Sequence, residues 1–213
     1  SSDLVESLSD LDMAVQAIDQ AGGKALPVHA LIESPLAVHR AFDIAAHPRL
    51  QSLSFGLMDF VSSHAGAIPS ESMGVQGQFS HPLVVRAKLD LASACHAHGK
   101  VPSHCVVTEF NDAQAIEQAA RQAAHTLGYT RMWSIHPAQI RPILKAMSPS
   151  AQAIDQACEV LLKAQQADWA PIGFGGQLHD RASYRYFWHL LERAHATGCR
   201  MPSQAQVFFN ASA

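Results

Sequence analysis

The sequence has few charged residues and no cluster of one sign. Asp, Glu, Lys and Arg together make up 15% of its 213 residues, and the formal net charge is −3. Because there is no run of lysines or arginines, the sequence does not have the electrostatic pattern of a protein that binds nucleic acid or an anionic membrane. No apolar stretch approaches the ~18 residues of a membrane span, and the first residues lack a basic-then-apolar signal region.

Cysteine is scarce as well, and it does not occur in pairs. The four cysteines are scattered and form no CxxC motif: Cys95, Cys105, Cys158 and Cys199. This pattern is typical of reduced thiols that are mostly buried, so we expect a cytoplasmic protein. With 48% apolar residues, the composition is that of an ordinary globular protein.

Short apolar segments alternate with amphipathic ones through the first two thirds of the sequence. We expect four strands, at 27–32, 50–55, 100–107 and 131–135. Their spacing of roughly 25–30 residues indicates parallel βαβ units, with strands that helices cover on both faces. This periodicity fits both a doubly wound sheet and a (β/α)8 barrel. No G-x-G-x-x-G or Walker sequence follows a strand, which weakens a nucleotide-binding version of the sheet.

Helices are predicted between the strands and in the last third of the chain. They cover residues 9–21, a segment opened by Ser34-Pro35, 82–98, about 112–127, a segment opened by Pro137, 150–166 and about 182–196. Ser34 suits the N-cap and Pro35 the first helical position. Residues 169–176 interrupt the helical pattern, and no strand pattern is evident beyond residue 148. We therefore expect a domain at 1–148 and a helical extension at 149–213.

Two carboxylates follow consecutive strands, at Glu33 and Asp59. In parallel α/β folds, side chains at the carboxyl ends of the strands build the functional site. Neighbouring strands are ~5 Å apart, so two carboxylates placed there repel each other unless a cation lies between them. Oxygen ligands with few protein donors suit Mg²⁺. The alternative is that each acid merely caps the helix that follows it.

Five short segments resemble those of the citrate-lyase-β and malyl-CoA lyase family, the HpcH/HpaI aldolases. They are ALIESPLAV at 30–38, FGLMDF at 55–60, TEFND at 108–112, SIHPAQI at 134–140 and GGQLHDR at 175–181, in the family's order. The resemblance implies a (β/α)8 TIM barrel, of which this chain holds about the C-terminal half, followed by a C-terminal extension. It also implies that Glu33 and Asp59 are ligands of Mg²⁺, with Mn²⁺ as a substitute.

The same resemblance implies an activity and an assembly. Members cleave a 3-hydroxyacyl thioester such as citryl- or malyl-CoA by retro-aldol chemistry and release a 2-oxo acid and an acyl-CoA. In the family, the aspartate at the position of Asp180 reaches into the site of a neighbouring subunit and acts as acid or base, which implies a homotrimer or hexamer. An N-cap for the last helix is the alternative role of Asp180.

Two other functions fit the same residues. A thioester hydrolase on the same scaffold would position the metal-bound acid while water attacks the thioester. A non-catalytic subunit of a larger complex would bind a small acid without turnover, although the presence of both Glu33 and Asp59 argues against it.

Histidines and one proline near predicted strand ends are further candidates. His104 and His136 follow the third and fourth strands, so they could line the pocket together with Pro137. His136 is explained equally well by packing at the turn from strand to helix.

Three features depart from the family's pattern. Met58 stands where the family commonly has glutamate, and Arg181 stands where it often has a short apolar residue. The resemblance also begins only at Leu4–Ser7, where the family's fourth strand ends. Four strands cannot close a barrel of eight, so we expect the chain to be part of a longer protein or to pair with another half.

Overall fold

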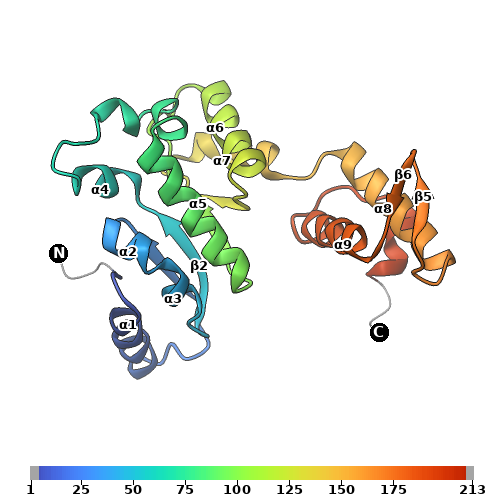
Figure 1. Ribbon diagram of the computed structural model, residues 1–213, viewed down its shortest axis with the longest axis horizontal. Helices are drawn as coiled ribbons and strands as arrows, with labels where there is room; N and C mark the ends of the chain where they lie inside the picture. Colours follow the sequence, from blue (N-terminus) through green and yellow to red (C-terminus); the bar gives the residue numbers. More distant parts are fainter. Residues whose placement is uncertain (1–4, 210–213) are drawn as a thin grey trace. The chain divides into compact units, whose positions relative to one another are not determined.

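The computed structural model describes residues 5–209. Leu4, at which the resemblance to the family begins, lies outside the described part. The chain forms two compact units, Ser1–Met147 and Ser148–Ala213. Figure 1 shows the elements of each unit along the chain. Within residues 5–209, no helix is long and apolar enough to cross a membrane. All four cysteines are free, and three of them are buried, as the sequence predicts.

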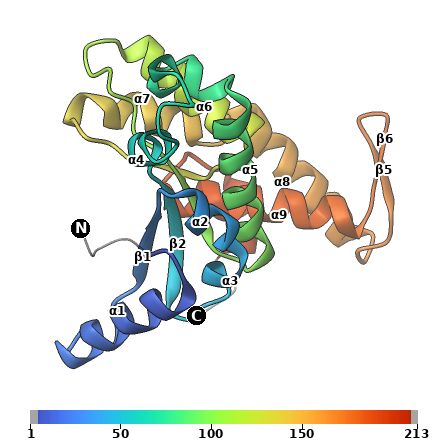
Figure 2. The same cartoon turned by 60° about the vertical axis from the view of Figure 1, so that its left-hand side comes forward.

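The first unit is built on a parallel sheet of four strands. They are β1 (Val28–Ile32), β2 (Leu50–Phe55), β3 (Val101–His104) and β4 (Arg131–Met132). They follow one another in chain order, and every neighbouring pair is parallel. Figure 2 shows β1 and β2 side by side. Because strand order does not reverse, right-handed connections carry the helices to one face, as in a (β/α) barrel and unlike a doubly wound sheet.

The helices of this unit lie between the strands. They are α1 (Leu8–Gln20), α2 (Pro35–His39), α3 (Ala41–Ala45), α4 (Leu57–Ser62), α5 (Pro82–Ala97), α6 (Ala113–Thr126) and α7 (Pro137–Met147), with the 3-10 turns η1 (Ser70–Met73) and η2 (Gly77–Phe79). Serines cap two of these helices, and the cap predicted at Ser34 is confirmed. Ser7 caps α1, and Ser34 caps α2 by accepting from Ala37 N at 3.0 Å, with Pro35 at the first position.

Several boundaries differ from the sequence prediction. The strand expected at 100–107 ends at His104, and the one expected at 131–135 has only two residues. The helix opened by Ser34-Pro35 breaks at Arg40 into α2 and α3. Strands covered on both faces were expected, but β1 alternates, with Ala30 buried and His29 exposed. Helices cover only one face of this strand. Its apolar residues point toward the helices, and they alternate with residues that point away from the helices.

The face of the sheet turned away from the helices carries a polar cluster. Arg131 Nη1 on β4 lies 3.3 Å from His29 Nδ1 on β1 and donates to Ser52 Oγ on β2 at 3.4 Å. The same His29 nitrogen also contacts Ser52. Burial and the nearby Arg131 guanidinium lower the pKa of His29. Side chains alternate along β1 and β2. His29 and Ser52 therefore lie on the same face of the sheet as positions 33 and 56, which directly follow the two strands.

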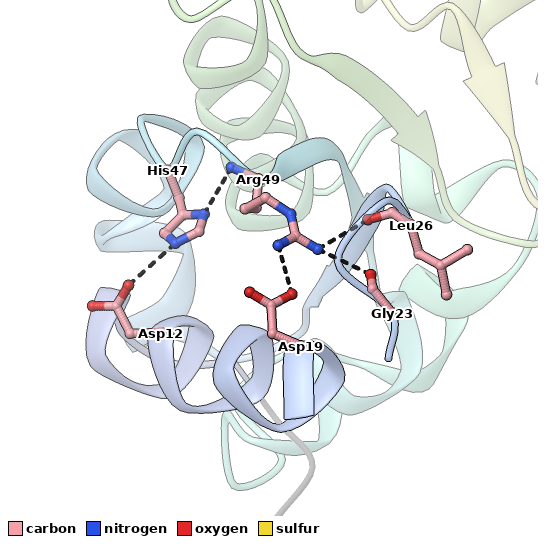
Figure 3. A network of polar contacts seen from close by, with 6 residues as sticks. All are labelled: Asp12, Asp19, Gly23, Leu26, His47 and Arg49. Atoms are coloured by element: carbon pink, nitrogen blue, oxygen red, sulfur yellow. Dashed lines mark hydrogen bonds and ion pairs between the residues drawn. The ribbon is translucent and has the colours of Figure 1, made fainter. Parts of the chain in front are cut away.

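A polar network ties α1 to the segment that enters β2 (Figure 3). Arg49 pairs with Asp19 at 2.6 Å and donates to the carbonyl oxygens of Gly23 and Leu26 at 3.2 and 3.3 Å. Two turns before Asp19 on α1, a carboxylate oxygen of Asp12 lies 3.1 Å from His47 Nε2. Arg49 immediately precedes β2, so the network secures the amino end of the sheet, opposite to the strand ends that carry Glu33 and Asp59.

The second unit packs α8 (Ala151–Gln166) against α9 (Arg181–Ala196), followed by the 3-10 turn η3 (Ser203–Phe208). The expectation that it contains no strand is wrong. Residues 172–179 form an antiparallel hairpin of β5 (Ile172–Phe174) and β6 (Gln177–His179). Gly175 and Gly176 make its two-residue turn with φ of 58° and 76°, the backbone that a type I′ turn requires and that glycine adopts without strain.

Candidate metal site

Glu33 and Asp59 are brought together at the carboxyl ends of β1 and β2. Glu33 directly follows β1, and Asp59 lies in the first turn of α4, four residues after β2 ends. The final residues of the two strands, Ile32 and Phe55, are register partners, and Gly56 N donates to Ile32 O at 2.9 Å. The parallel register therefore sets both acids at one edge of the sheet.

The two carboxylates interact with each other. Glu33 is 9% exposed, and burial raises the pKa of its carboxyl above the ordinary value; the negative charge of Asp59 and a hydrogen bond to it raise this pKa further. Two acids that interact in this way favour a shared proton or a shared cation. Their donor set consists only of oxygen, which is the chemistry of a hard divalent ion such as Mg²⁺.

The capping alternative does not account for either acid. Ser34, and not Glu33, caps α2, and the N-cap of α4 is Gly56, without any side-chain cap. Within residues 5–209, no group of three or more His, Cys, Asp and Glu could hold a metal ion. The two carboxylates, which interact with each other, have the oxygen chemistry of a cation that takes few protein ligands and fills its other positions with water or a bound acid.

Gly56 is a part of this site that the sequence analysis missed. A Cβ atom built on Gly56 would lie 2.4 Å from Glu33 Oε2 and 2.5 Å from Glu33 Cβ. The Glu33 side chain therefore occupies the space that any other residue at position 56 would fill. The available signal was the glycine at the end of an apolar strand, a pattern that often marks a close approach of another group.

His104 does not line an accessible pocket. Its side chain is fully buried, stacked on Phe79 at 5.3 Å between ring centroids and edge-on to Tyr129 at 5.0 Å. Burial and the nearby Lys88 ammonium hold the pKa of His104 well below its ordinary range, so the ring is neutral. Alternation along β3 explains the difference, because His104 falls on the face that the helices cover.

His136 and Pro137 lie at the carboxyl end of β4, and both are exposed. His136 Nδ1 accepts from Ala138 N at 3.2 Å, at the start of the helix α7 that Pro137 opens. The nearby Gln139 is buried and connects the ends of two strands: it donates to Val107 O at 2.7 Å and accepts from Ile135 N at 2.9 Å. Gln139 thus supports this edge of the sheet. The sequence analysis missed this role because a polar residue in an amphipathic helix is expected on its exposed face.

A buried lysine secures the segment that follows α4. Lys88 on α5 is fully buried and donates to the backbone oxygen of Gln78 at 3.1 Å and to its Oε1 at 2.8 Å. Its ammonium also lies 4.4 Å from the centroid of the Phe79 ring. Burial lowers the pKa of Lys88 to about 8. These contacts anchor η2 on α5.

Asp180 caps α9 in the second unit. Its Oδ1 accepts from Ala182 N at 3.0 Å and from Ser183 N at 3.3 Å, and Asp180 N donates to Ser183 Oγ at 2.9 Å, which completes a capping box. The carboxylate is exposed, and only Oδ1 takes part in these bonds. The capping role is therefore present, and it leaves the second carboxylate oxygen available to a ligand.

Comparisons with known proteins identify the relatives of this chain. The family model described as HpcH/HpaI aldolase/citrate lyase matches residues 3–137. A crystal structure of a citrate lyase from Burkholderia xenovorans is 50% identical, with a TM-score of 0.84 over 96% of this chain and 66% of that one. The protein CitE of Mycobacterium tuberculosis, solved with magnesium, acetoacetate and coenzyme A, is 26% identical, with a TM-score of 0.69 over 90% of this chain and 66% of that one.

A curated relative points to the same group. The L-malyl-CoA/beta-methylmalyl-CoA lyase of Cereibacter sphaeroides is 30% identical over 82% of this chain and 59% of its own length. The chain thus spans about three fifths of that relative. The family model covers well over half of the 213 residues. The chain therefore belongs to the HpcH/HpaI aldolase/citrate lyase family.

Proposed function

We propose that the protein is a Mg²⁺-dependent carbon–carbon lyase that cleaves a 3-hydroxyacyl-CoA thioester, of the citryl- or malyl-CoA kind, into a 2-oxo acid and an acyl-CoA. The observation that carries the proposal is the facing pair Glu33 and Asp59, with the raised pKa of Glu33 and the close approach of Gly56. The relatives named as a malyl-CoA lyase and as a citrate lyase support the reaction class.

The residues of this chain have distinct tasks in that reaction. A bound Mg²⁺ would polarise the oxygen of the acid and favour the charge that develops on cleavage. Glu33 and Asp59 would hold the ion at the sheet edge, and the buried position of Glu33 fixes the direction of the Glu33 side chain. The bond between the hydroxyl-bearing carbon and the thioester α-carbon breaks as the hydroxyl proton passes to a water molecule, and the hydroxyl oxygen becomes the carbonyl oxygen of the 2-oxo acid. The electron pair remains on the α-carbon side, and the proton that this carbon receives comes from Asp180.

Metal titration tests the site. We expect Mg²⁺ or Mn²⁺ to bind in the presence of glyoxylate or oxaloacetate by calorimetry, and Glu33→Gln and Asp59→Asn each to abolish this binding. Asp43→Asn on α3 removes an exposed carboxylate elsewhere and serves as the matched control. A wild-type protein that binds neither metal nor oxo acid would refute the proposal.

Product analysis separates the lyase from a thioester hydrolase. A lyase consumes the thioester, yields the oxo acid and keeps the acyl group on CoA. A hydrolase releases free CoA and the intact hydroxy acid. Appearance of free thiol without any oxo acid would overturn the lyase and favour the hydrolase.

We also propose that Asp180 acts on the site of a neighbouring copy in a homotrimer or hexamer. Glu33→Gln and Asp180→Asn chains, each inactive alone, are expected to regain about a quarter of wild-type activity when assembled together at random in equal amounts, because one site in four then has both intact residues. If Asp180 served its own chain, no mixed assembly would contain an intact site, and activity would stay absent.

A further inference from the structure

The second unit contains a pocket whose residues take no part in the proposed bond cleavage. It has a volume of about 490 Å³ and lies between α8, α9 and the segment that follows α8. Aromatic and cationic side chains dominate its walls: Leu161, Trp169, Arg181, Tyr184, Arg185 and Trp188. A ligand of this pocket must therefore be able to stack on aromatic rings and also to pair with guanidinium groups.

The aromatic walls are held in place by the protein. The Tyr184 hydroxyl shares its one proton between two carbonyl oxygens, Ala170 O at 2.7 Å and His179 O at 3.1 Å. Trp169 meets the Tyr184 ring edge-on, with 6.0 Å between centroids. Trp188 is stacked on Phe209 at 5.6 Å, with an angle of 12° between the ring planes. Rings fixed before a ligand arrives lose little conformational freedom on binding, so they form a good stacking surface.

The backbone at Trp169 is strained in a way that places its ring at the pocket. Asp168 and Trp169 have φ of 51° and 61°, a region that residues other than glycine rarely adopt. Trp169 N donates to Ala164 O at 2.7 Å, which closes the end of α8. The indole is nevertheless 50% exposed, so burial alone does not explain why a large apolar residue occupies this position.

The two arginines of the pocket have an unfavourable arrangement without an anion. Arg181 and Arg185 are four residues apart at the amino end of α9 and lie on one side of it. Like charges at this spacing repel, and the helix dipole disfavours a cation in the first turn, where Arg181 lies next to the capping Asp180. Within residues 5–209, neither guanidinium lies within 4.0 Å of a carboxylate oxygen. A bound anion would relieve both effects.

We propose that this pocket binds a nucleoside phosphate. The base stacks on Trp169 and Trp188, with the buried Tyr184 supporting the Trp169 ring, and the phosphate groups pair with Arg181 and Arg185. The nucleotide is either the adenosine phosphate end of the thioester, in which case the inference rests on the proposed function, or a free nucleotide that binds independently of it.

Tryptophan fluorescence tests the proposal directly. The sequence has three tryptophans, and two of them line the pocket, so Trp133→Phe leaves emission only from Trp169 and Trp188. In this background, without metal or oxo acid, ADP is expected to quench the emission in a saturable way. Arg181→Gln and Arg185→Gln should each weaken ADP binding about tenfold, the effect of losing a charge-assisted hydrogen bond. Arg193→Gln, an exposed arginine of the same helix, is the matched control and should bind ADP as before.

A competition experiment identifies the source of the nucleotide. If CoA displaces ADP, the pocket takes the nucleotide end of the thioester; if ADP binds and CoA does not compete, the pocket takes a free nucleotide. Absence of quenching by millimolar ADP would overturn the proposal, as would equal binding by the Arg181→Gln, Arg185→Gln and Arg193→Gln variants. Because no metal or oxo acid is present, this failure is distinct from failure of the lyase reaction, which the metal titration and product analysis measure.

Discussion

Gly56 lies so close to Glu33 that a single added methyl group would overlap the Glu33 carboxylate, with 2.4 Å between the new Cβ and Oε2. The backbone at Gly56 has φ of −97°, which any residue adopts, so glycine is needed here for space and not for conformation. The carboxylate pair and this glycine are therefore one structural unit at the end of β2. Two of the predictions below concern this unit, one concerns the buried Lys88, and one concerns the Arg49 network at the opposite end of the sheet.

Gly56→Ala should displace Glu33 and abolish metal binding. Forcing a methyl group into a filled space costs about 1–3 kcal/mol of unfolding free energy. Calorimetric Mn²⁺ titration and urea unfolding measure the two effects. Gly173→Ala is the control, because a Cβ at Gly173 meets no atom within 4 Å. Unchanged metal affinity in Gly56→Ala would show that Glu33 is not a ligand in this position.

Glu33→Gln should stabilise the metal-free protein at pH 7 and remove the stabilisation that Mg²⁺ provides. The pKa of Glu33 is raised, so its charged form is disfavoured in the fold. The folded state then binds more protons than the unfolded state between the ordinary and the raised pKa, and metal-free stability falls as pH rises through that range. Melting temperatures with and without Mg²⁺, at pH 5 and pH 7, test this. A wild-type protein without Mg²⁺-dependent stabilisation would contradict it.

Lys88→Met should change how stability depends on alkaline pH. The pKa of Lys88 is lowered from 10.5 to about 8 by burial, so the unfolded chain binds more protons than the folded one between these values. The contribution of Lys88 to stability therefore rises with pH across this window. The difference in unfolding free energy between wild type and Lys88→Met should grow in favour of the wild type from pH 8 to pH 10.5. A difference independent of pH would mean that Lys88 keeps its ordinary pKa in the fold.

Arg49→Ala should destabilise the first unit without changing metal affinity. Arg49 is three-quarters buried and makes one ion pair and two hydrogen bonds to carbonyl oxygens (Figure 3). Their loss is expected to cost about 1–3 kcal/mol, because an ion pair and two hydrogen bonds from a charged group are removed together. Arg86→Ala is the control, since its pair with Asp90 is exposed and at 3.5 Å; it should cost well under 1 kcal/mol. Equal costs in urea unfolding would show that the network in Figure 3 adds nothing.

The sequence by itself determined the local elements and the place of the two acids. Ser34 followed by Pro35 predicts a helix start because both residues act through the backbone of that one turn. Glu33 and Asp59 could be assigned to one sheet edge because parallel strands in chain order end together, and the structure places them within reach of each other. The family was likewise carried by short local motifs.

Only the tertiary structure decided what each of those residues touches. His104 is a strand-end residue in the sequence, but the face on which it falls depends on where β3 pairs, and that face is buried. Gly56 and Lys88 acquire their roles through neighbours that are distant in the chain, Glu33 and Gln78, and no local signal specifies such contacts. The β5–β6 hairpin had a local signal in its Gly-Gly turn, but its strands of three residues are too short to show alternation. Pairing and burial are non-local, so side-chain environment was decided by the fold and not by the motif.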